Sequence, residues 1–268
     1  MSQEITRTLD DATVAELAGR LWEAEANAAP IAPLTEDHPG MTADDAFDIQ
    51  LVNIRRRLDG GAKVTGHKVG LASEAMQKMM GVDEPDYGHL LDTMEYAQSA
   101  PVDTSRLCRP RVELEVAFVL GKDVPAEGVG LEELPEYIEW VVPSIELIDS
   151  RIADWKITLP DTIADNASSC GYIVGEGRVA MGDIDVAAIA VDMHRNGEHM
   201  ASGRSDAVLG NPLNAVSWLA RKVSQFGVRL RAGDVLLPGT AIRAQDVYPG
   251  DHVLAEFAGL GTVSLDFS

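Results

Sequence analysis

The sequence predicts an α+β fold with a β-rich core and peripheral helices, and three observations support this. Apolar residues recur at helical spacing near the N-terminus, at positions 14, 17, 18, 21 and 22. From residue 64 onward, short apolar runs typical of strands alternate with Gly and Pro turns. The dipeptide Asn196-Gly197 lies between two extended runs, which is a strong hairpin signal.

Two helices are expected before the first strand. The apolar stripe at 14–22 indicates the first helix, and residues 30–39 are a Pro-rich loop. Thr42 and Asp45 have the spacing of a capping box, which predicts the start of the second helix, and Gly60-Gly61 predicts its end. We expect residues 1–62 to form an N-terminal helical subregion and residues 63–268 a β-rich catalytic domain.

The remaining segments are assigned in chain order. Asn211-Pro212 combines an N-cap residue with a proline at the first helical position, so a helix should begin there, run to about Phe226 and stop at Gly227. The other expected elements are a strand at 64–69, a serine-capped helix at 73–80, a strand at 111–120, a helix at 131–140, a strand at 141–148 and short strands between Gly turns at 235–267.

Composition narrows the class of protein. The 268 residues are enough for a buried core, and 46% of them are hydrophobic, as in ordinary globular proteins. No apolar run is long enough for a membrane span, the N-terminus lacks a secretory pattern, and the two cysteines lack metal-site spacing, so we expect a cytoplasmic protein. The net charge of −21 disfavours nucleic acid and anionic membranes as partners, and a carboxylate substrate would need local positive charge.

Two glutamates alternate with apolar residues in the clearest strand, residues 111–120. Side chains on a strand point to opposite faces in turn, so Glu113 and Glu115 should lie on one face, about 7 Å apart at the backbone. The alternative interpretation is an ordinary solvent-exposed face opposite an apolar one.

A third glutamate, Glu146, lies inside the apolar strand at 143–148. A carboxylate in such a place needs a cation or strong donors, because burying it alone is very costly. Three carboxylates without a His or Cys cluster favour a hard, oxygen-preferring ion, Mg²⁺ or Mn²⁺ rather than Zn²⁺. Pairing of Glu146 with an arginine is the structural alternative.

These segments belong to a series of motifs with a specific order and spacing. From about Ala46 to the C-terminus, the chain resembles the 2-oxopent-4-enoate (2-hydroxypentadienoate) hydratase and 4-oxalocrotonate decarboxylase family, within the fumarylacetoacetate hydrolase superfamily. The motifs that carry the resemblance are Gly66-His67-Lys68-Val69-Gly70-Leu71, Glu84-Pro85-Asp86-Tyr87-Gly88, Pro110-Arg111-Val112-Glu113-Leu114-Glu115, Pro143-Ser144-Ile145-Glu146, Asp165-Asn166-Ala167-Ser168 and Gly210-Asn211-Pro212-Leu213-Asn214-Ala215.

The resemblance implies a mixed β-roll fold with helical additions and a homo-oligomer. It implies that Glu113, Glu115 and Glu146 bind a divalent ion, usually Mg²⁺ or Mn²⁺, and that Lys68 and Asp86 act in catalysis. Physical reasoning agrees in part. Three glutamates and one divalent ion sum to −1, so an incoming 2-oxo acid needs the charge of a residue such as Lys68. The alternatives are a surface lysine and an aspartate that only caps its turn.

Two further segments are candidates for substrate binding. Asn166 and Ser168 could present donors to the substrate carboxylate, although an ordinary helix-capping turn is the alternative. Gly239 and Thr240 follow a strand and could offer backbone N–H groups to an anion. Here Pro238 stands where many relatives have Ser or Thr, which weakens the case for a hydroxyl contact.

The expected function is a metal-dependent hydratase that adds water to 2-hydroxypenta-2,4-dienoate, or a close homologue, and gives a 4-hydroxy-2-oxo acid in aromatic or steroid ring breakdown. One alternative is decarboxylation of 2-oxohex-3-enedioate (4-oxalocrotonate). An alternative of another class is a non-catalytic partner subunit of such an enzyme. A pathway aldolase or decarboxylase is a possible protein partner.

Overall fold

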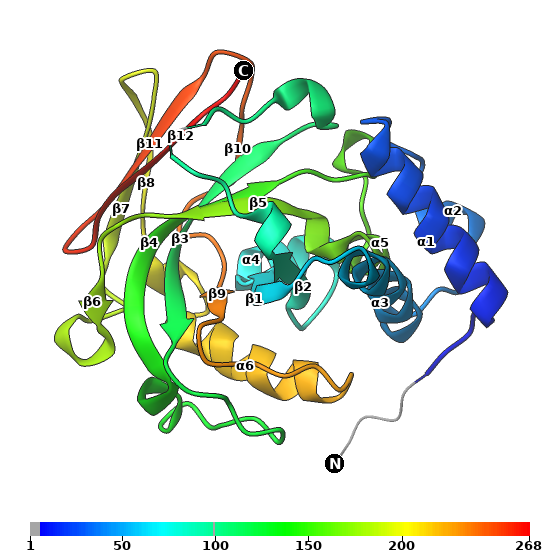
Figure 1. Ribbon diagram of the computed structural model, residues 1–268, viewed down its shortest axis with the longest axis horizontal. Coiled ribbons are helices and arrows are strands. Elements are labelled where there is room, and N and C mark those ends of the chain that lie inside the picture. Colours follow the sequence, from blue (N-terminus) through cyan, green and yellow to red (C-terminus); the bar gives the residue numbers. More distant parts are fainter. Residues whose placement is uncertain (1–5, 99) are drawn as a thin grey trace.

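The computed structural model describes residues 6–98 and 100–268, which form helices around two β-sheets (Figure 1). The α-helices are α1 (Asp11–Ala26), α2 (Leu34–Asp37), α3 (Ala43–Asp59), α4 (Glu74–Met80), α5 (Leu159–Ala164) and α6 (Pro212–Ser224). The strands are β1 (Val64–Gly70), β2 (Asp86–Leu91), β3 (Arg111–Leu120), β4 (Ile138–Ile148), β5 (Ser169–Val174), β6 (Val179–Ala180), β7 (Ala190–Arg195), β8 (Glu198–Arg204), β9 (Val235–Leu237), β10 (Gln245–Asp246), β11 (His252–Phe257) and β12 (Gly261–Asp266).

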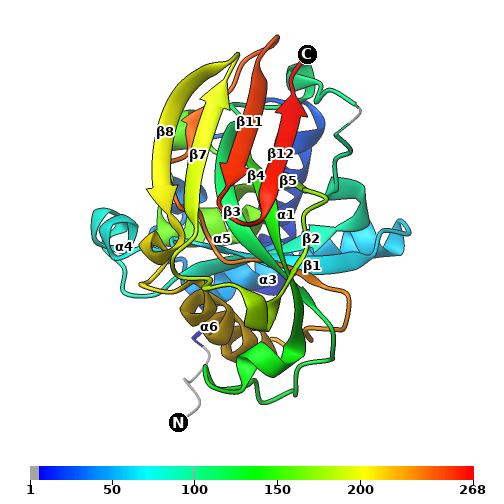
Figure 2. The same ribbon diagram turned by 90° about the vertical axis from the view of Figure 1, so that its left-hand side faces the viewer.

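The larger sheet has the strand order β2-β1-β9-β3-β4-β5, with β10 added to β3 and β6 added to β4. The long strands β3 and β4 curve strongly, so this sheet curls around the centre of the molecule (Figure 1). The smaller sheet, in the order β12-β11-β7-β8, packs against β4 and β5 on the outside of the curl (Figure 2). The expected α+β fold with a β-rich core is confirmed.

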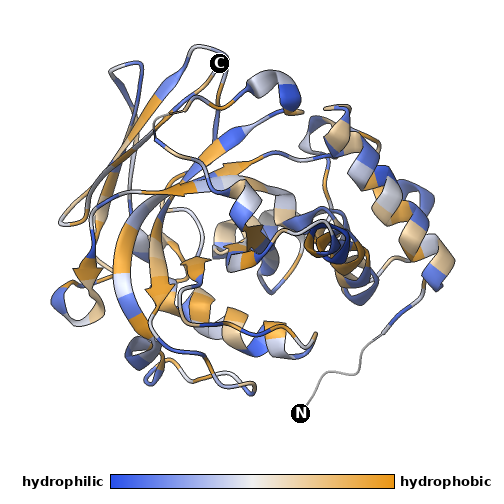
Figure 3. Ribbon diagram, in the orientation of Figure 1, coloured by the Kyte–Doolittle hydropathy of each residue, from blue (hydrophilic) through white to orange (hydrophobic). Residues whose placement is uncertain are grey.

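Both faces of β3 and β4 are covered, so these strands are buried along almost their whole length. They are mostly apolar, with polar residues interrupting the apolar stretches (Figure 3). One expectation here is wrong. No helix spans 131–140; a short 3₁₀ turn occupies Leu134–Tyr137, and β4 already begins at Ile138. Pro135 lacks a backbone donor, and the β-branched run that follows it pairs with β3 instead of continuing a helix.

The helical signals near the N-terminus are confirmed. The apolar stripe of α1 is buried, and α1 packs against α3. The capping box at the start of α3 has both of its hydrogen bonds: Thr42 N–H donates to Asp45 at 2.9 Å, and Asp45 N–H donates to the Thr42 hydroxyl at 3.2 Å.

The helix signal in the C-terminal half is also confirmed. Asn211 caps α6 and Pro212 follows it, as expected.

The N-terminal helices share their core with the sheets. One continuous apolar cluster includes Leu17 of α1, Phe47 of α3, Leu114 of β3 and Val216 of α6. The division at residue 62 therefore stays a prediction about folding units, because α3 packs closely against α5 of the C-terminal part. Among the described residues, no helix has the length and apolar character needed to cross a bilayer.

Asp45 provides a test of how the N-terminal segment is held. Its carboxylate accepts hydrogen bonds from the backbone of Thr8, Leu9 and Thr42. Burial opposes ionisation of this carboxyl, but these bonds dominate and lower its pKa to about 2 from 3.8. We expect Asp45→Ala to destabilise the protein by about 2 kcal/mol, a magnitude typical of hydrogen bonds to a charged group.

The measurement is urea unfolding of the parent and the variant at several pH values. The contribution of Asp45 is fully present above its unfolded pKa and is lost as pH falls through its folded pKa, so the two proteins should converge toward pH 2. Asp59→Ala, at the exposed end of the same helix, is the control. Equal effects of the two substitutions would contradict the role of Asp45.

Candidate metal centre and active-site cleft

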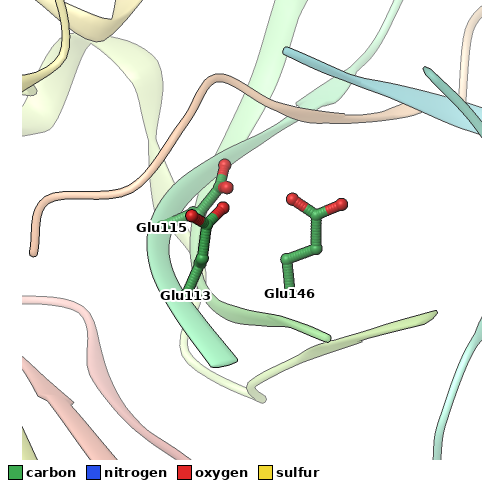
Figure 4. A group of neighbouring side chains, drawn as sticks. All are labelled: Glu113, Glu115 and Glu146. Atoms are coloured by element: carbon green, nitrogen blue, oxygen red, sulfur yellow. The ribbon is translucent and has the colours of Figure 1, made fainter. Parts of the chain in front are cut away.

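Three glutamates converge because of the register between β3 and β4. Glu113 lies directly opposite Glu146 in the antiparallel pairing, and Glu115 follows two residues later on the same face. Figure 4 shows the three carboxylates extending to the same side of the sheet. One oxygen from each lies within 4.8 Å of the others. The expected exposed-face alternative is therefore excluded, since all three side chains are buried.

The glutamate oxygens are poorly matched by protein donors. Gly239 N–H donates to Glu115 Oε2 at 2.7 Å. The other Glu115 oxygen and both Glu146 oxygens are buried without a hydrogen-bond partner among the described residues. Among the described residues no arginine pairs with Glu146. The nearby cation is Lys68, whose Nζ lies 3.6 Å from Glu146 Oε2, an ion-pair distance rather than a hydrogen bond. Buried carboxylates in this state need either an additional cation or a proton.

The electrostatics lead to the same conclusion. The pKa of Glu113 is raised to about 7, mainly by burial. The attraction of Lys68 lowers it, whereas repulsion by Glu146 and Asp86 raises it further. Burial and repulsion by Glu146 and Glu113 raise the pKa of Glu115 well above its ordinary value. Burial also raises the pKa of Glu146. A divalent ion would offset both the burial and the repulsion, and an all-oxygen donor set without His or Cys fits Mg²⁺ or Mn²⁺.

Lys68 lies on β1, with its side chain on the glutamate side of the sheet. Only 3% of it is exposed, so it is no surface lysine. Its Nζ donates to the Ala167 carbonyl at 2.9 Å. Burial disfavours its charge, but the surrounding carboxylates, Glu146 and Asp86 foremost, outweigh burial and raise its pKa above the usual value. These carboxylates therefore favour the charged ammonium form of Lys68 at neutral pH.

Asp86 begins β2 directly opposite Gly70 of β1. It is buried, and burial raises its pKa although the charge of Lys68 and the neighbouring Thr162 side chain act in the opposite direction. Its Oδ1 has no partner among the described residues. A Cβ at Gly70 would lie 2.1 Å from that Oδ1 and 3.2 Å from Lys68 Nζ, so glycine is needed there to leave room for both groups. Sequence reasoning missed Gly70 and Thr162.

A left-handed turn, residues Asn166–Ser168, joins α5 to β5. Its three residues have φ values of 54°, 52° and 55° without containing a glycine. Such conformations cost about 1–3 kcal/mol per residue and persist only where surrounding contacts enforce them. The turn directs the Ala167 carbonyl to Lys68. The Asn166 side chain accepts from His89 N–H at 2.8 Å and donates to the His89 carbonyl at 3.0 Å, which anchors the turn to β2.

A solvent-open cleft of about 530 Å³ gives access to this centre. The residues with polar side chains that line it are Lys68, Ser73, Asp86, Glu113, Thr162, Ser168 and Thr240. The Ser168 hydroxyl is buried and has no hydrogen-bond partner within residues 6–98 and 100–268, which leaves its donor and acceptor available to a ligand. The Thr240 hydroxyl is hydrogen-bonded to the backbone of Leu114 and Ile242.

The cleft collects most of the predicted site residues but not all of them. Lys68, Asp86, Glu113, Ser168, Gly239 and Thr240 line it, and Glu115 and Glu146 complete the carboxylate cluster. Asn166 instead lines a separate cavity of about 480 Å³ beside α1 and α3. His67, the neighbour of Lys68 on β1, does not line the cleft. The imidazole ring of His67 instead contacts the rings of Tyr87 and His89 on the opposite face of the sheet.

Comparison with known proteins agrees with this site. Residues 68–267 match the model of the fumarylacetoacetate (FAA) hydrolase C-terminal family. The chain is 41% identical over 252 residues to a 2-keto-4-pentenoate hydratase of Paraburkholderia xenovorans strain LB400, covering 94% of both chains. It is also 41% identical to a 2-hydroxyhexa-2,4-dienoate hydratase of Comamonas testosteroni, covering 93% of this chain and 95% of the relative.

A solved structure, 4-oxalocrotonate decarboxylase from Pseudomonas putida G7 complexed with magnesium and adipate, superposes with a TM-score of 0.93 at 36% identity, covering 98% of this chain and 100% of that one. The similarity to these relatives extends over nearly the full length of the chain, and the range 68–267 of the family model contains the three glutamates. The chain belongs to the fumarylacetoacetate hydrolase family.

Proposed function

We propose that this protein is a Mg²⁺- or Mn²⁺-dependent hydratase that converts 2-hydroxypenta-2,4-dienoate, or a close homologue, to a 4-hydroxy-2-oxo acid. The observation that carries the proposal is the convergence of three buried, unmatched glutamates with Lys68 and Asp86 at one cleft. Hydratases among the relatives support it. A non-catalytic subunit would have no need to keep so costly a cluster of buried charges.

In this proposal Glu113, Glu115 and Glu146 hold the ion. When bound, a divalent cation supplies Lewis acidity that polarises the 2-oxygen and the carboxylate of a 2-oxo acid. The chain itself supplies the remaining charge. Lys68 is the cation that attracts the substrate carboxylate into an otherwise acidic cleft, and its hydrogen bond to Ala167 fixes the position of that charge.

Asp86 is the proposed proton carrier. Its raised pKa makes the protonated form accessible nearer to neutral pH than for an ordinary aspartate, which suits a group that must both donate and accept a proton. Hydration requires a proton at the far end of the diene with loss of the 2-hydroxyl proton, which gives the 2-oxo-3-enoate. The water oxygen then adds at C4 with loss of a proton, and C3 gains a proton. The net change is the addition of one water molecule.

Backbone and hydroxyl donors are proposed to orient the substrate carboxylate. Ser168 has the clearest support, because its buried hydroxyl lines the cleft and is unpartnered. Gly239 and Thr240 line the cleft too, although Gly239 N–H already donates to Glu115. The side chain of Asn166 is bonded to His89, so we propose that Asn166 contributes by shaping the turn that presents Ser168.

The character of the cleft walls favours the hydratase over the decarboxylase. The large apolar side chains that line the cleft are those of Leu71, Met76, Ile148, Trp155 and Ile157. Lys68 is the single cationic residue among the described residues that line it. A dicarboxylate such as 2-oxohex-3-enedioate would need a second cation, whereas the short hydrocarbon end of a dienoate suits an apolar wall.

Nearby cations outside the lining are already paired. Arg111 donates to Asp246 at 2.8 Å, and its guanidinium stacks on the Trp155 ring. Lys156 Nζ lies 3.8 Å from Asp154. Asp154 is shared with Arg109, whose guanidinium lies 4.0 Å from it, and all three of these side chains are more than half exposed. The preference for a monocarboxylate therefore rests on the lining of the cleft itself, where Lys68 is the one cation among the described residues.

The wider setting is part of the proposal as well. We infer a homo-oligomer in the cytoplasm that acts in aromatic or steroid ring breakdown, with a pathway aldolase or decarboxylase as a possible partner. The support is the family resemblance and the names of the relatives, which are hydratases of 2-keto-4-pentenoate and of 2-hydroxyhexa-2,4-dienoate.

The reaction can be tested by product analysis. The purified chain is incubated with 2-hydroxypenta-2,4-dienoate and separately with 2-oxohex-3-enedioate, each with Mg²⁺, and the products are identified by NMR. We expect 4-hydroxy-2-oxopentanoate from the dienoate and little CO₂ from the dicarboxylate. Faster release of CO₂ than hydration would establish the decarboxylase instead.

The pKa values of the glutamates predict how metal binding depends on pH. Since burial and repulsion raise these pKa values, for Glu113 to about 7, protons must leave the cluster when the ion binds. Calorimetric titration with Mn²⁺ should give an affinity that falls as pH decreases from 8 to 5.5. EDTA should abolish activity and Mg²⁺ should restore it. Affinity that is constant over this range, or full turnover without metal, would rule out the cluster as the site.

Two nearly isosteric variants should separate binding from chemistry. Glu113→Gln replaces a charged ligand with a weaker neutral one, so metal affinity and activity should both fall. Asp86→Asn should keep the ion but lose about 10²–10⁴-fold in kcat, the typical contribution of a general acid–base group. Calorimetry and steady-state kinetics on both variants provide the test. Turnover of Asp86→Asn at the parental rate would show that Asp86 only caps its turn.

A further inference from the structure

A buried glutamine of α3 connects the elements that carry the proposed catalytic groups. Gln50 is 1% exposed and lies on the face of α3 that packs against β2 and α5. Its amide nitrogen donates to the Tyr87 carbonyl at 3.0 Å and to the Ile163 carbonyl at 2.7 Å. Its amide oxygen lies 3.0 Å from His89 Nδ1. The three partners come from β2 and α5.

Each backbone partner is the neighbour of a site residue. Tyr87 directly follows Asp86, and Ile163 directly follows Thr162, which lines the cleft together with Asp86. The two hydrogens of one amide therefore fix the separation between the strand that carries Asp86 and the helix that carries Thr162. Displacement of either element would change the position of the Asp86 carboxylate in the cleft.

The chemistry of the contacts fixes the protonation of His89. Carbonyl oxygens can only accept, so the Gln50 nitrogen must face Tyr87 and Ile163, and its oxygen must face His89. His89 Nδ1 must then carry a hydrogen. Burial lowers the pKa of His89 to about 4, so at neutral pH the ring is neutral with its proton on Nδ1. The backbone of His89 is in turn bonded on both sides to Asn166, next to the carbonyl that receives Lys68.

We propose that Gln50 is a positioning residue for the reaction: through Tyr87, Ile163 and His89 it holds Asp86 and Thr162 at the spacing that proton transfer requires. The inference rests on the proposed catalytic role of Asp86. Catalytic groups are effective only when supporting hydrogen bonds hold them within a fraction of an ångström of the productive geometry. Gln50 touches neither the cleft nor the glutamate cluster, so its removal should leave metal binding unchanged.

The first test compares Gln50→Met with Asn53→Leu. Methionine matches the shape of glutamine without its hydrogen bonds. Asn53, one turn further along the same helix, donates to the Ala18 carbonyl of α1 at 2.9 Å, so its substitution also removes a helix-to-backbone bond but one that leads away from the cleft. For Gln50→Met we expect kcat to fall about 10- to 100-fold while KM and Mn²⁺ affinity stay near the parental values. For Asn53→Leu we expect parental kcat despite a similar loss of thermal stability.

The second test uses His89 and does not depend on Gln50→Met folding. Asparagine can replace the Nδ1 donor to Gln50, whereas leucine cannot. His89→Asn should therefore keep most of the parental kcat, and His89→Leu should lose it. In the parent, ¹⁵N NMR of labelled histidine should show the neutral Nδ1-protonated form of His89, and Gln50→Met should change that signal.

The outcomes distinguish this inference from the proposed function. A parent that turns over neither substrate would overturn the proposed function. An active parent for which Gln50→Met and Asn53→Leu have equal kcat, or for which the loss lies wholly in KM or metal affinity, would overturn the positioning role alone. Equal kcat for His89→Asn and His89→Leu would also contradict it.

Discussion

The placement of one glutamate directly opposite another across two buried strands is the constraint on which the rest of the structure depends. Like charges in directly opposed positions of an antiparallel pair repel each other, and burial increases that cost. Glu113 and Glu146 occupy such positions, and Glu115 adds a third carboxylate on the same face. The curled sheet tolerates this arrangement because Lys68 and a divalent ion can restore the charge balance. We therefore interpret the cluster as a preformed binding site, which makes the folded protein less stable when the ion is absent.

The residues around the cluster also hold a buried charged pair and a strained turn in energetically unfavourable positions. Gly70 lacks a side chain so that Lys68 and Asp86 can approach each other. The left-handed turn at 166–168 turns a carbonyl toward Lys68 and leaves the Ser168 hydroxyl free. Both features reduce local stability, but they place Lys68, Asp86 and Ser168 at the cleft. The compensating bonds come from outside the cleft, from Asn166 and Gln50, which secure β2, α5 and the turn by their backbones.

Much of the fold and site could be predicted from sequence because the patterns are local. The alternation at 111–120 placed two glutamates on one face, and the capping signals at Thr42 and Asn211 located two helices. The pairing of Glu113 with Glu146 could not be predicted without the family resemblance, since register depends on contacts between distant segments. The turn at 166–168 carries no glycine to signal its left-handed backbone. The helix expected at 131–140 failed because Pro135 and the β-branched run after it favour a strand. Gln50 did carry a signal: it is a polar residue on the buried stripe of α3, one turn after Phe47.

Locating the bound ion tests the metal site most directly. A crystal of the protein grown with Mn²⁺ and a non-reactive 2-oxo acid gives an anomalous signal that identifies the metal without ambiguity. The account predicts a peak bounded by oxygens of Glu113, Glu115 and Glu146, with the 2-oxo acid filling the remaining positions and Lys68 beside its carboxylate. A peak at other residues, with the three glutamates protonated and bonded to one another, would contradict it.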